Sequence, residues 1–282
     1  MMKRKLFMKE IIWILMGMGF LMFGAFLWLI SPMPQPREDV LSNQNYYIAH
    51  AAGSINGKTY LNCQEALLKS LSNGYKYVEL DLSLTTDSTL VCVHDWSHFC
   101  KNLVGDSTEK AVSIDEFLGK SILGKYTPLT LQRAIEIQQT HPYVIVTDKI
   151  SDTKILNREF QHNRNHVMVE AFTLSDYVEL KKAGYIPMLS LWKFDYPQIF
   201  WDFIYYPLKY HTKIDWICVH SSSNMKSLRM MKRLFNCKVA MYTCNSKTFF
   251  AEHLGKEIDL VYTDNWNPLT QTNNDTLYTT AY

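Results

Sequence analysis

The chain has 282 residues, of which 47% are hydrophobic, and a formal net charge of +2. This length suits one barrel-sized domain with a small appendage, and the hydrophobic content is enough for a large core. The near balance of 29 basic and 27 acidic residues argues against a nucleic-acid-binding protein, which would usually carry a basic stripe. We therefore expect no nucleic acid among its partners.

The first element along the chain is an uncharged apolar segment at residues 11–30. As a helix, it would span about 30 Å, the thickness of the hydrocarbon core of a membrane. The basic residues that precede it are Lys3, Arg4, Lys5 and Lys9. The positive-inside rule then predicts a single-pass signal-anchor helix with residues 1–10 as a cytoplasmic basic tail and the rest of the chain outside the cytoplasm. The alternatives are a cleaved signal peptide, although no small-x-small cleavage site follows, and a buried core helix.

Three further segments complete the predicted domain organisation. Residues 31–44 contain Pro32, Pro34 and Pro36 and predict a stiff, extended linker leading away from the membrane. The folded domain is expected at residues 45–267, followed by a polar C-terminal tail at 268–282. The six cysteines form no C-x-x-C pair, which argues against a zinc site, and the sequence assigns no disulfide.

Within the domain, short β-rich runs alternate with longer amphipathic stretches such as 62–74, 130–141 and 224–235. The runs expected to form strands are 46–50, 77–82, 143–148, 166–172, 186–192, 215–221, 238–245 and 259–264. Such alternation predicts a parallel sheet, and eight units predict closure into a (β/α)₈ TIM barrel over residues 46–265. An open doubly wound sheet is the alternative.

One additional β-rich run, residues 89–95, breaks the alternation. Because the turn-like residues 85–88 alone separate it from the second strand, we expect a hairpin there. Residues 96–128 have no clear period and are interpreted as an insertion over the mouth of the barrel.

Polar or aromatic residues stand near the C-terminal ends of the predicted barrel strands. They are His50, Asp81, Asp148, Glu170, Trp192, His220, Thr243 and Asp264. The loops at this face of a barrel converge on the site of chemistry, so we expect several of these side chains to line a site. Some of them are equally explained as strand ends that meet solvent.

Four residues carry the chemical prediction: His50, Glu79, Asp81 and His94. Glu79 and Asp81 are two apart on one strand and point to the same side, where burial and mutual repulsion favour a bound divalent cation. Oxygen ligands favour calcium or magnesium over zinc. A hard metal that neutralises a phosphate, with two histidines as acid and base, would suffice to cleave a phosphodiester.

The same residues lie in an ordered series of short motifs. These are AHAAG (49–53), NCQEAL (62–67), GYKYVELDL (74–82), TTD (85–87) and VHD (93–95). The series resembles the glycerophosphodiester phosphodiesterase family, which is related in fold to the phosphatidylinositol-specific phospholipases C. The family's motifs run H-R-G, then E-N-T or N-S-x-E-A, then E-x-D, T-x-D-G and H-D. Weaker resemblance continues through most of residues 46–265.

The resemblance implies roles for individual residues. His50 and His94 match the general acid and base, without a decision as to which is which, and Glu79 and Asp81 match two metal ligands. Asp148 is the candidate third ligand, because the family's third carboxylate comes from the next strand, often within E-x-K.

Two departures from the family concern the positive charge that binds the phosphate. The family's arginine is replaced by Ala51, so that one cation is missing, and Lys58 or Lys149 is the candidate substitute. Lys149 directly follows Asp148, so strand alternation would point it away from the metal unless the strand bulges there.

The remaining expectations concern the substrate. Residues at strand or loop ends that are candidates for contacting it are Trp96, Glu170, Trp192, His220 and Tyr242. The aromatic segment 194–211 is interpreted as a helix packed on the barrel or touching the membrane surface. The predicted function is a membrane-anchored phosphoric diester hydrolase acting on a glycerophosphodiester, a phospholipid headgroup or a phosphodiester-linked surface polymer. The alternative is a degenerate barrel that binds a phosphorylated ligand or partner without turnover.

Overall fold

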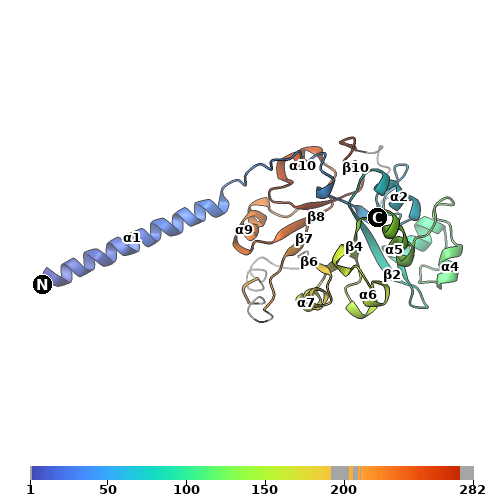
Figure 1. Ribbon diagram of the computed structural model, residues 1–282, viewed down its shortest axis with the longest axis horizontal. Coiled ribbons are helices and arrows are strands. Elements are labelled where there is room, and N and C mark those ends of the chain that lie inside the picture. Colours follow the sequence, from blue (N-terminus) through green and yellow to red (C-terminus); the bar gives the residue numbers. More distant parts are fainter. Residues whose placement is uncertain (1, 192–202, 206–208, 210, 274–282) are drawn as a thin grey trace.

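Eight parallel strands close into a barrel in the computed structural model, which describes residues 2–191, 203–205, 209 and 211–273, with side chains from residue 13 onward (Figure 1). The barrel strands are β1 (Tyr47–Ala49), β2 (Tyr77–Leu84), β4 (Val144–Asp148), β5 (Val167–Ala171), β6 (Ile186–Ser190), β7 (Trp216–His220), β8 (Lys238–Tyr242) and β9 (Leu260–Thr263). Ala49 pairs with both Val78 of β2 and Thr263 of β9, and this double pairing of β1 closes the sheet. The predicted barrel is therefore confirmed and the open sheet is excluded.

Helices surround the barrel on its outer face (Figure 1). They are α2 (Gln64–Ser72), α5 (Leu131–Thr140), α6 (Thr153–Glu159), α7 (Leu174–Lys182), α9 (Met225–Phe235) and α10 (Lys247–His253). Several begin at a residue whose side chain accepts a hydrogen bond from the first turn, which satisfies an amide without an intrahelical partner. These capping residues are Thr130, Asp152, Thr173, Asn224 and Ser246.

The hydrophobic core has two parts, as strand alternation requires. Side chains such as Ile48, Val146 and Met168 fill the barrel interior, whereas Val78 and Leu80 point outward to the layer beneath the helices. Because Val78 and Leu80 point outward, the alternating residues of β2 point inward. This alternation places Glu79 and Asp81 together inside the barrel.

The predicted hairpin is confirmed. Strand β3 (Leu90–Cys92) pairs antiparallel with β2, with Leu82 opposite Cys92. The insertion that follows contains α3 (Trp96–His98), a π-helical turn η3 (Phe99–Val104) and α4 (Ile114–Gly119). Figure 1 places α4 at the outer edge of the molecule near α2 and α5.

Helix α1 (Met2–Ile30) projects from the side of the barrel, and its residues 13–28 are exposed (Figure 1). Within the described part of the chain it is the one helix long and apolar enough to cross a membrane, over Trp13–Ile30. The linker after it differs from the predicted spacer, because it packs on the barrel. Val40 is buried in the core and its carbonyl accepts a hydrogen bond of 2.9 Å from the Tyr47 hydroxyl.

Two predictions fall on residues that the structure does not describe. Trp192 lies outside the described residues, and so does most of the aromatic segment 194–211. The strand predicted to include Trp192 is described as β6 and ends at Ser190.

Candidate active site

The C-terminal ends of the barrel strands surround a cavity of about 370 Å³, within the range of small-molecule sites. Among its lining residues are His50, Glu79, Asp148, Lys149, Glu170 and Tyr242. These six come from β1, β2, β4, β5 and β8 or from the residues that directly follow those strands. Residues far apart in the sequence therefore converge on one volume, as expected at this face of a barrel.

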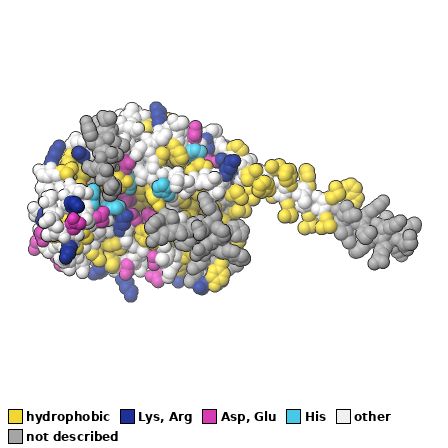
Figure 2. Space-filling model, turned by 180° about the vertical axis from the view of Figure 1, so that it is seen from behind, with side chains coloured by type: hydrophobic (Ala, Val, Ile, Leu, Met, Phe, Trp, Pro, Cys, Tyr) yellow, Lys and Arg dark blue, Asp and Glu magenta, His cyan; other side chains and the backbone are white. Residues whose placement is uncertain are grey.

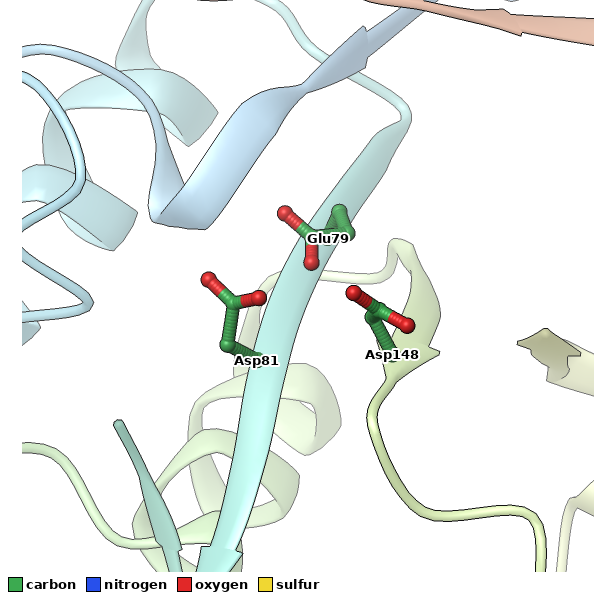
Figure 3. A group of neighbouring side chains, drawn as sticks. All are labelled: Glu79, Asp81 and Asp148. Carbon is green, nitrogen blue, oxygen red and sulfur yellow. The ribbon is translucent and has the colours of Figure 1, made fainter. Parts of the chain in front are cut away.

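Three carboxylates form the centre of the site (Figure 3). Oxygen atoms of Glu79, Asp81 and Asp148 all lie within 4.8 Å of one another. Asp148 reaches the other two because β4 pairs with β2 in register, with Asp81 opposite Asp148. The predicted third carboxylate thus lies next to the E-x-D pair, and the set could hold one hard divalent cation.

The environment of these carboxylates opposes their ionisation. Glu79 and Asp81 are each 2% exposed, and burial is the main cause that raises the pKa of both groups. Repulsion from neighbouring carboxylates, including Asp148, adds to this effect. Attraction by the imidazoles of His94 and His50 and the hydrogen bond from Asn62 lower the pKa of Asp81, but burial and Asp148 outweigh them. A divalent cation would relieve the repulsion, so the donor set fits a metal.

Hydrogen bonds hold two of the carboxylates in place. The Asn62 side-chain amide donates to Asp81 Oδ2 at 2.8 Å, and the Ala51 backbone N–H donates to Glu79 Oε2 at 2.5 Å. The second bond depends on a left-handed turn, because Ala51 and Ala52 have φ values of 48° and 68°. Gly53 continues the turn at φ 91°, and a Cβ there would lie 2.0 Å from Ser70 Oγ. The backbone path after His50 therefore requires glycine at position 53.

The two histidines lie just beyond the ends of their strands, and each has a carboxylate partner. His50 Nδ1 is 2.8 Å from Asp264 Oδ1, and His94 Nδ1 is 3.0 Å from Asp95 Oδ2. The ring of Tyr60 lies edge-on to both imidazoles, with centroid distances of 4.6 Å to His50 and 6.3 Å to His94. The structure therefore brings both predicted histidines to the same site as the carboxylates.

Asp264 is held on both of its oxygens. Besides the contact with His50, its Oδ2 accepts a hydrogen bond of 2.7 Å from the Asn245 side chain. Burial, the largest single influence, would raise the pKa of Asp264, but the hydrogen bond and attraction of His50 together with the hydrogen bond from Asn245 outweigh it and lower the pKa. An ionised Asp264 keeps the proton of a neutral His50 on Nδ1 and leaves Nε2 as the nitrogen available to a substrate.

Lys149 lies in the cavity despite directly following Asp148. Its φ of 72° is left-handed, which breaks the strand alternation and brings Nζ within 3.1 Å of Asp148 Oδ2. Burial lowers the pKa of Lys149, but attraction by Asp148, Asp81 and Glu79 exceeds that effect and raises the pKa overall. This side chain supplies a positive charge close to the carboxylates. Lys58, the other candidate cation, lies in the turn at 55–58 and is not among the cavity-lining residues.

The other predicted substrate contacts divide into two groups. Glu170 and Tyr242 line the cavity, and burial followed by repulsion from Asp148 raises the pKa of Glu170 to about 8. His220 is exposed at the rim, where its ring lies 5.6 Å from that of Tyr242. Trp96 packs instead on Phe99 and Phe117, and its Nε1 donates to the Leu84 carbonyl at 3.1 Å, which describes a packing role.

Sequence reasoning left several residues of the site without a role. Asp264 stands at a predicted strand end and Asn62 lies in a motif, so the sequence marks both positions. Their contacts with His50 and Asp81 form only in the closed barrel. No pattern in the sequence indicated Tyr60, Phe172 or Tyr262, which contribute aromatic surface at or near the cavity.

Comparison with known proteins gives one family and many structures of the same fold. The model of the glycerophosphoryl diester phosphodiesterase family matches residues 56–196, half of the chain. No curated protein matches the chain.

Among solved structures, a glycerophosphoryl diester phosphodiesterase from Parabacteroides distasonis is 15% identical with a TM-score of 0.61, covering 86% of this chain and 88% of its own. A glycerophosphodiester phosphodiesterase from Thermotoga maritima is 20% identical with a TM-score of 0.60, covering 79% and 95%. A phosphodiesterase from Oleispira antarctica, in complex with the product sn-glycerol-3-phosphate, is 17% identical with a TM-score of 0.62, covering 85% and 95%. At these identities the structures show a shared fold.

Proposed function

We propose, from the premise that this chain belongs to the glycerophosphoryl diester phosphodiesterase family and is therefore a phosphoric diester hydrolase, that it cleaves its substrate with a divalent metal and two histidines. The observation that carries the proposal is the cluster of three carboxylates beside the cavity, with the carboxylate-paired His50 on the cavity wall and the carboxylate-paired His94 on the other side of the Tyr60 ring. The substrate class is a glycerophosphodiester, a phospholipid headgroup or a phosphodiester-linked surface polymer. The product bound to the Oleispira antarctica enzyme, sn-glycerol-3-phosphate, is consistent with the first two.

Glu79, Asp81 and Asp148 would hold the metal. Their oxygen donors suit a hard ion, calcium or magnesium, and such an ion neutralises negative charge on a phosphate and stabilises it as it is attacked. Asn62 and the Ala51 amide keep two of the ligands oriented before any ion binds.

His50 and His94 would move the protons. One imidazole accepts the proton of the attacking hydroxyl, which belongs to water or to a neighbouring hydroxyl of the substrate, and the other donates a proton to the departing alkoxide. If the substrate's own hydroxyl attacks, a cyclic phosphate forms and the alcohol leaves, and water opens the ring in a second step. Asp264 and Asp95 act by orienting the two rings.

Lys149 would replace the arginine that the family carries at the position of Ala51. The left-handed backbone at Lys149 supports this assignment, because it brings the ammonium group to the carboxylates. Glu170 and Tyr242 line the same cavity and would contact the alcohol part of the substrate.

The proposed location is a membrane, with α1 crossing it once, the N-terminus in the cytoplasm and the barrel outside. Basic residues before the apolar helix support this orientation. Protease added to intact cells should then digest the barrel domain, and full protection of an intact chain would contradict the topology.

The test of activity uses the full chain in nanodiscs and a panel of glycerophosphodiesters with calcium, magnesium or a chelator. We expect a metal-dependent rate that falls by about 10²-fold or more in His50→Ala and His94→Ala, the usual contribution of general acid or base catalysis. The exposed variant His141→Ala, outside the site, serves as the control. Ligand binding without turnover across the panel would instead support the non-catalytic alternative.

A further inference from the structure

The end of α1 is bound to the barrel by two arginines of α9. Arg229 Nη1 donates to the Ile30 carbonyl at 3.0 Å, and Arg233 Nη1 donates to the Ser31 carbonyl at 3.0 Å and to the Trp28 carbonyl. The Arg233 guanidinium also lies 5.0 Å from the centroid of the Trp28 ring. These contacts join α1 directly to the wall of the barrel.

The contacts are electrostatically favourable. The last carbonyls of a helix lack intrahelical partners and form the negative end of its dipole, so guanidinium groups there satisfy acceptors and stabilise the helix end. Arg229 is held in position by Glu257, a buried carboxylate at 2.6 Å. Figure 2 shows basic side chains where the projecting apolar helix meets the barrel.

The segment after α1 is also fixed to the barrel. A Cβ added at Gly255 would lie 2.9 Å from Pro36 Cβ, so the proline segment runs closely along the turn before β9. Glu38 accepts a hydrogen bond of 2.6 Å from the Tyr46 hydroxyl. The helix and the barrel are therefore connected by a docked segment, which sets the orientation of one relative to the other.

This connection fixes the level of α9 relative to a bilayer. The apolar stretch Trp13–Ile30 spans about 27 Å as a helix, close to the hydrocarbon thickness, so its end would lie at the headgroups. Arg233, which contacts that end, then lies at the same level. Helix α9 is about 16 Å long and starts five residues after His220, at the rim of the cavity. The rim of the barrel at the start of α9 is therefore at most about the length of this helix from the headgroup layer.

We infer that α9 is the side of the barrel that faces the bilayer, and that the arginine contacts with α1 present the cavity to phosphodiesters in lipid headgroups of the same membrane. The choice of lipid substrate rests on the proposed function. Of the four basic residues of α9, three are held by Glu257, Asp259 and the end of α1, and the exposed Lys226 remains for the phosphate layer. Leu234 on the same helix is 47% exposed. A water-soluble diester would gain nothing from this placement, whereas a headgroup is held at high local concentration beside the cavity.

The orientation is tested without reference to activity. A nitroxide label is attached at Leu234→Cys on α9 or, as the matched control, at Leu118→Cys on α4, which is 53% exposed and lies at the opposite end of the molecule from α1 (Figure 1). Both variants carry Cys244→Ser, because Cys244 is partly exposed. In nanodiscs whose lipids chelate nickel at their headgroups, we expect relaxation to be enhanced at residue 234 at least about threefold over residue 118, because collision requires proximity to the headgroups. Equal enhancement would overturn the inference.

The substrate source is tested with the full chain in discs of phosphatidylglycerol and phosphatidylethanolamine, against their deacylated headgroup diesters in solution. Arg233→Ala should lower the rate on the lipids by about threefold to tenfold and leave the rate on the soluble diesters unchanged, because effective concentration is lost. Lys182→Ala, which removes an exposed charge on α7, should change neither rate. Turnover of the soluble diesters without turnover of the lipids would overturn the lipid assignment. Failure of both substrate classes would contradict the proposed function, and the label measurement would still decide the orientation.

Discussion

The mouth of the barrel and the α1–α9 junction both contain buried charge, but they organise it in opposite ways. At the junction, Arg229 is paired with Glu257 at 2.6 Å and Lys232 with Asp259 at 2.6 Å. At the mouth, three carboxylates lie within 4.8 Å of one another. Charges of opposite sign compensate one another in the first region, whereas the like charges of the second are costly until a cation joins them. Paired opposite charges are thus typical of a cluster that holds the structure together, and unpaired like charges are typical of a cluster that binds a cation.

The largest expected difference follows from removing one charge at the mouth. Asp81→Asn should lower the metal-dependent rate by about 10³-fold or more, equivalent to about 4 kcal/mol of transition-state stabilisation. The metal-free protein should unfold at the same or a higher temperature, because the substitution relieves repulsion with Glu79 and Asp148. Calorimetry and initial rates check both outcomes, with the exposed Asp115→Asn as control. If the metal-free variant is instead less stable than the wild type, Asp81 stabilises the fold and the expected repulsion with the other carboxylates is contradicted.

A smaller kinetic effect is expected from replacing Asp264, the carboxylate partner of His50. Asp264→Asn should lower kcat by about 10²-fold while KM changes little, because the amide favours the wrong tautomer of His50. The pH profile of kcat should shift as well, since the variant removes an ionised neighbour of the imidazole. An unchanged kcat would show that the contact does not position the ring.

At the junction the expected effect is on stability rather than on rate. Glu257→Gln should lower the free energy of unfolding by about 2 kcal/mol, because a buried hydrogen bond between charged groups is lost. The catalytic rate of the folded variant should be unchanged. Burial would raise the pKa of Glu257, but the Arg229 contact, with hydrogen bonds from the Glu257 backbone amide and His253, outweighs it and lowers the pKa below the ordinary 4.5. A lowered folded pKa means that the contribution is complete above pH 4.5 and is lost as the pH falls through the folded value.

The gap in unfolding free energy between the wild type and Glu257→Gln should therefore be full at pH 7 and shrink below pH 4.5. Thermal or urea unfolding across this range measures it, with Glu252→Gln, a largely exposed carboxylate of α10, as the control. A gap that stays constant with pH would mean that packing, not charge, explains the contact.

The smallest expected effect concerns the proposed phosphate contact. Lys149→Gln should raise KM by about tenfold, near 1.4 kcal/mol, because one positive charge near the phosphate is lost. Lys58→Gln serves as the comparison, since Lys58 is the other predicted cation. A larger effect at Lys58 than at Lys149 would reverse the assignment.

The alternation of apolar runs and the position of E-x-D predicted the barrel and the inward direction of Glu79 and Asp81, because both depend on strand geometry alone. The in-register pairing of Asp81 with Asp148 follows from adjacent parallel strands. The course of Lys149 could not be predicted, because a non-glycine residue with a left-handed φ leaves no mark in a single sequence. The docking of the proline segment and the arginine contacts with α1 join residues about 200 apart, which no local pattern encodes.

The central claim is that Glu79, Asp81 and Asp148 form a metal centre. Crystals soaked in manganese, a hard ion suited to oxygen ligands, would test it through anomalous scattering. We predict one anomalous peak at about 2.0–2.6 Å from an oxygen of each of the three carboxylates, and its loss in Asp81→Asn. A peak elsewhere, or none between these side chains under conditions that support activity, would contradict the claim.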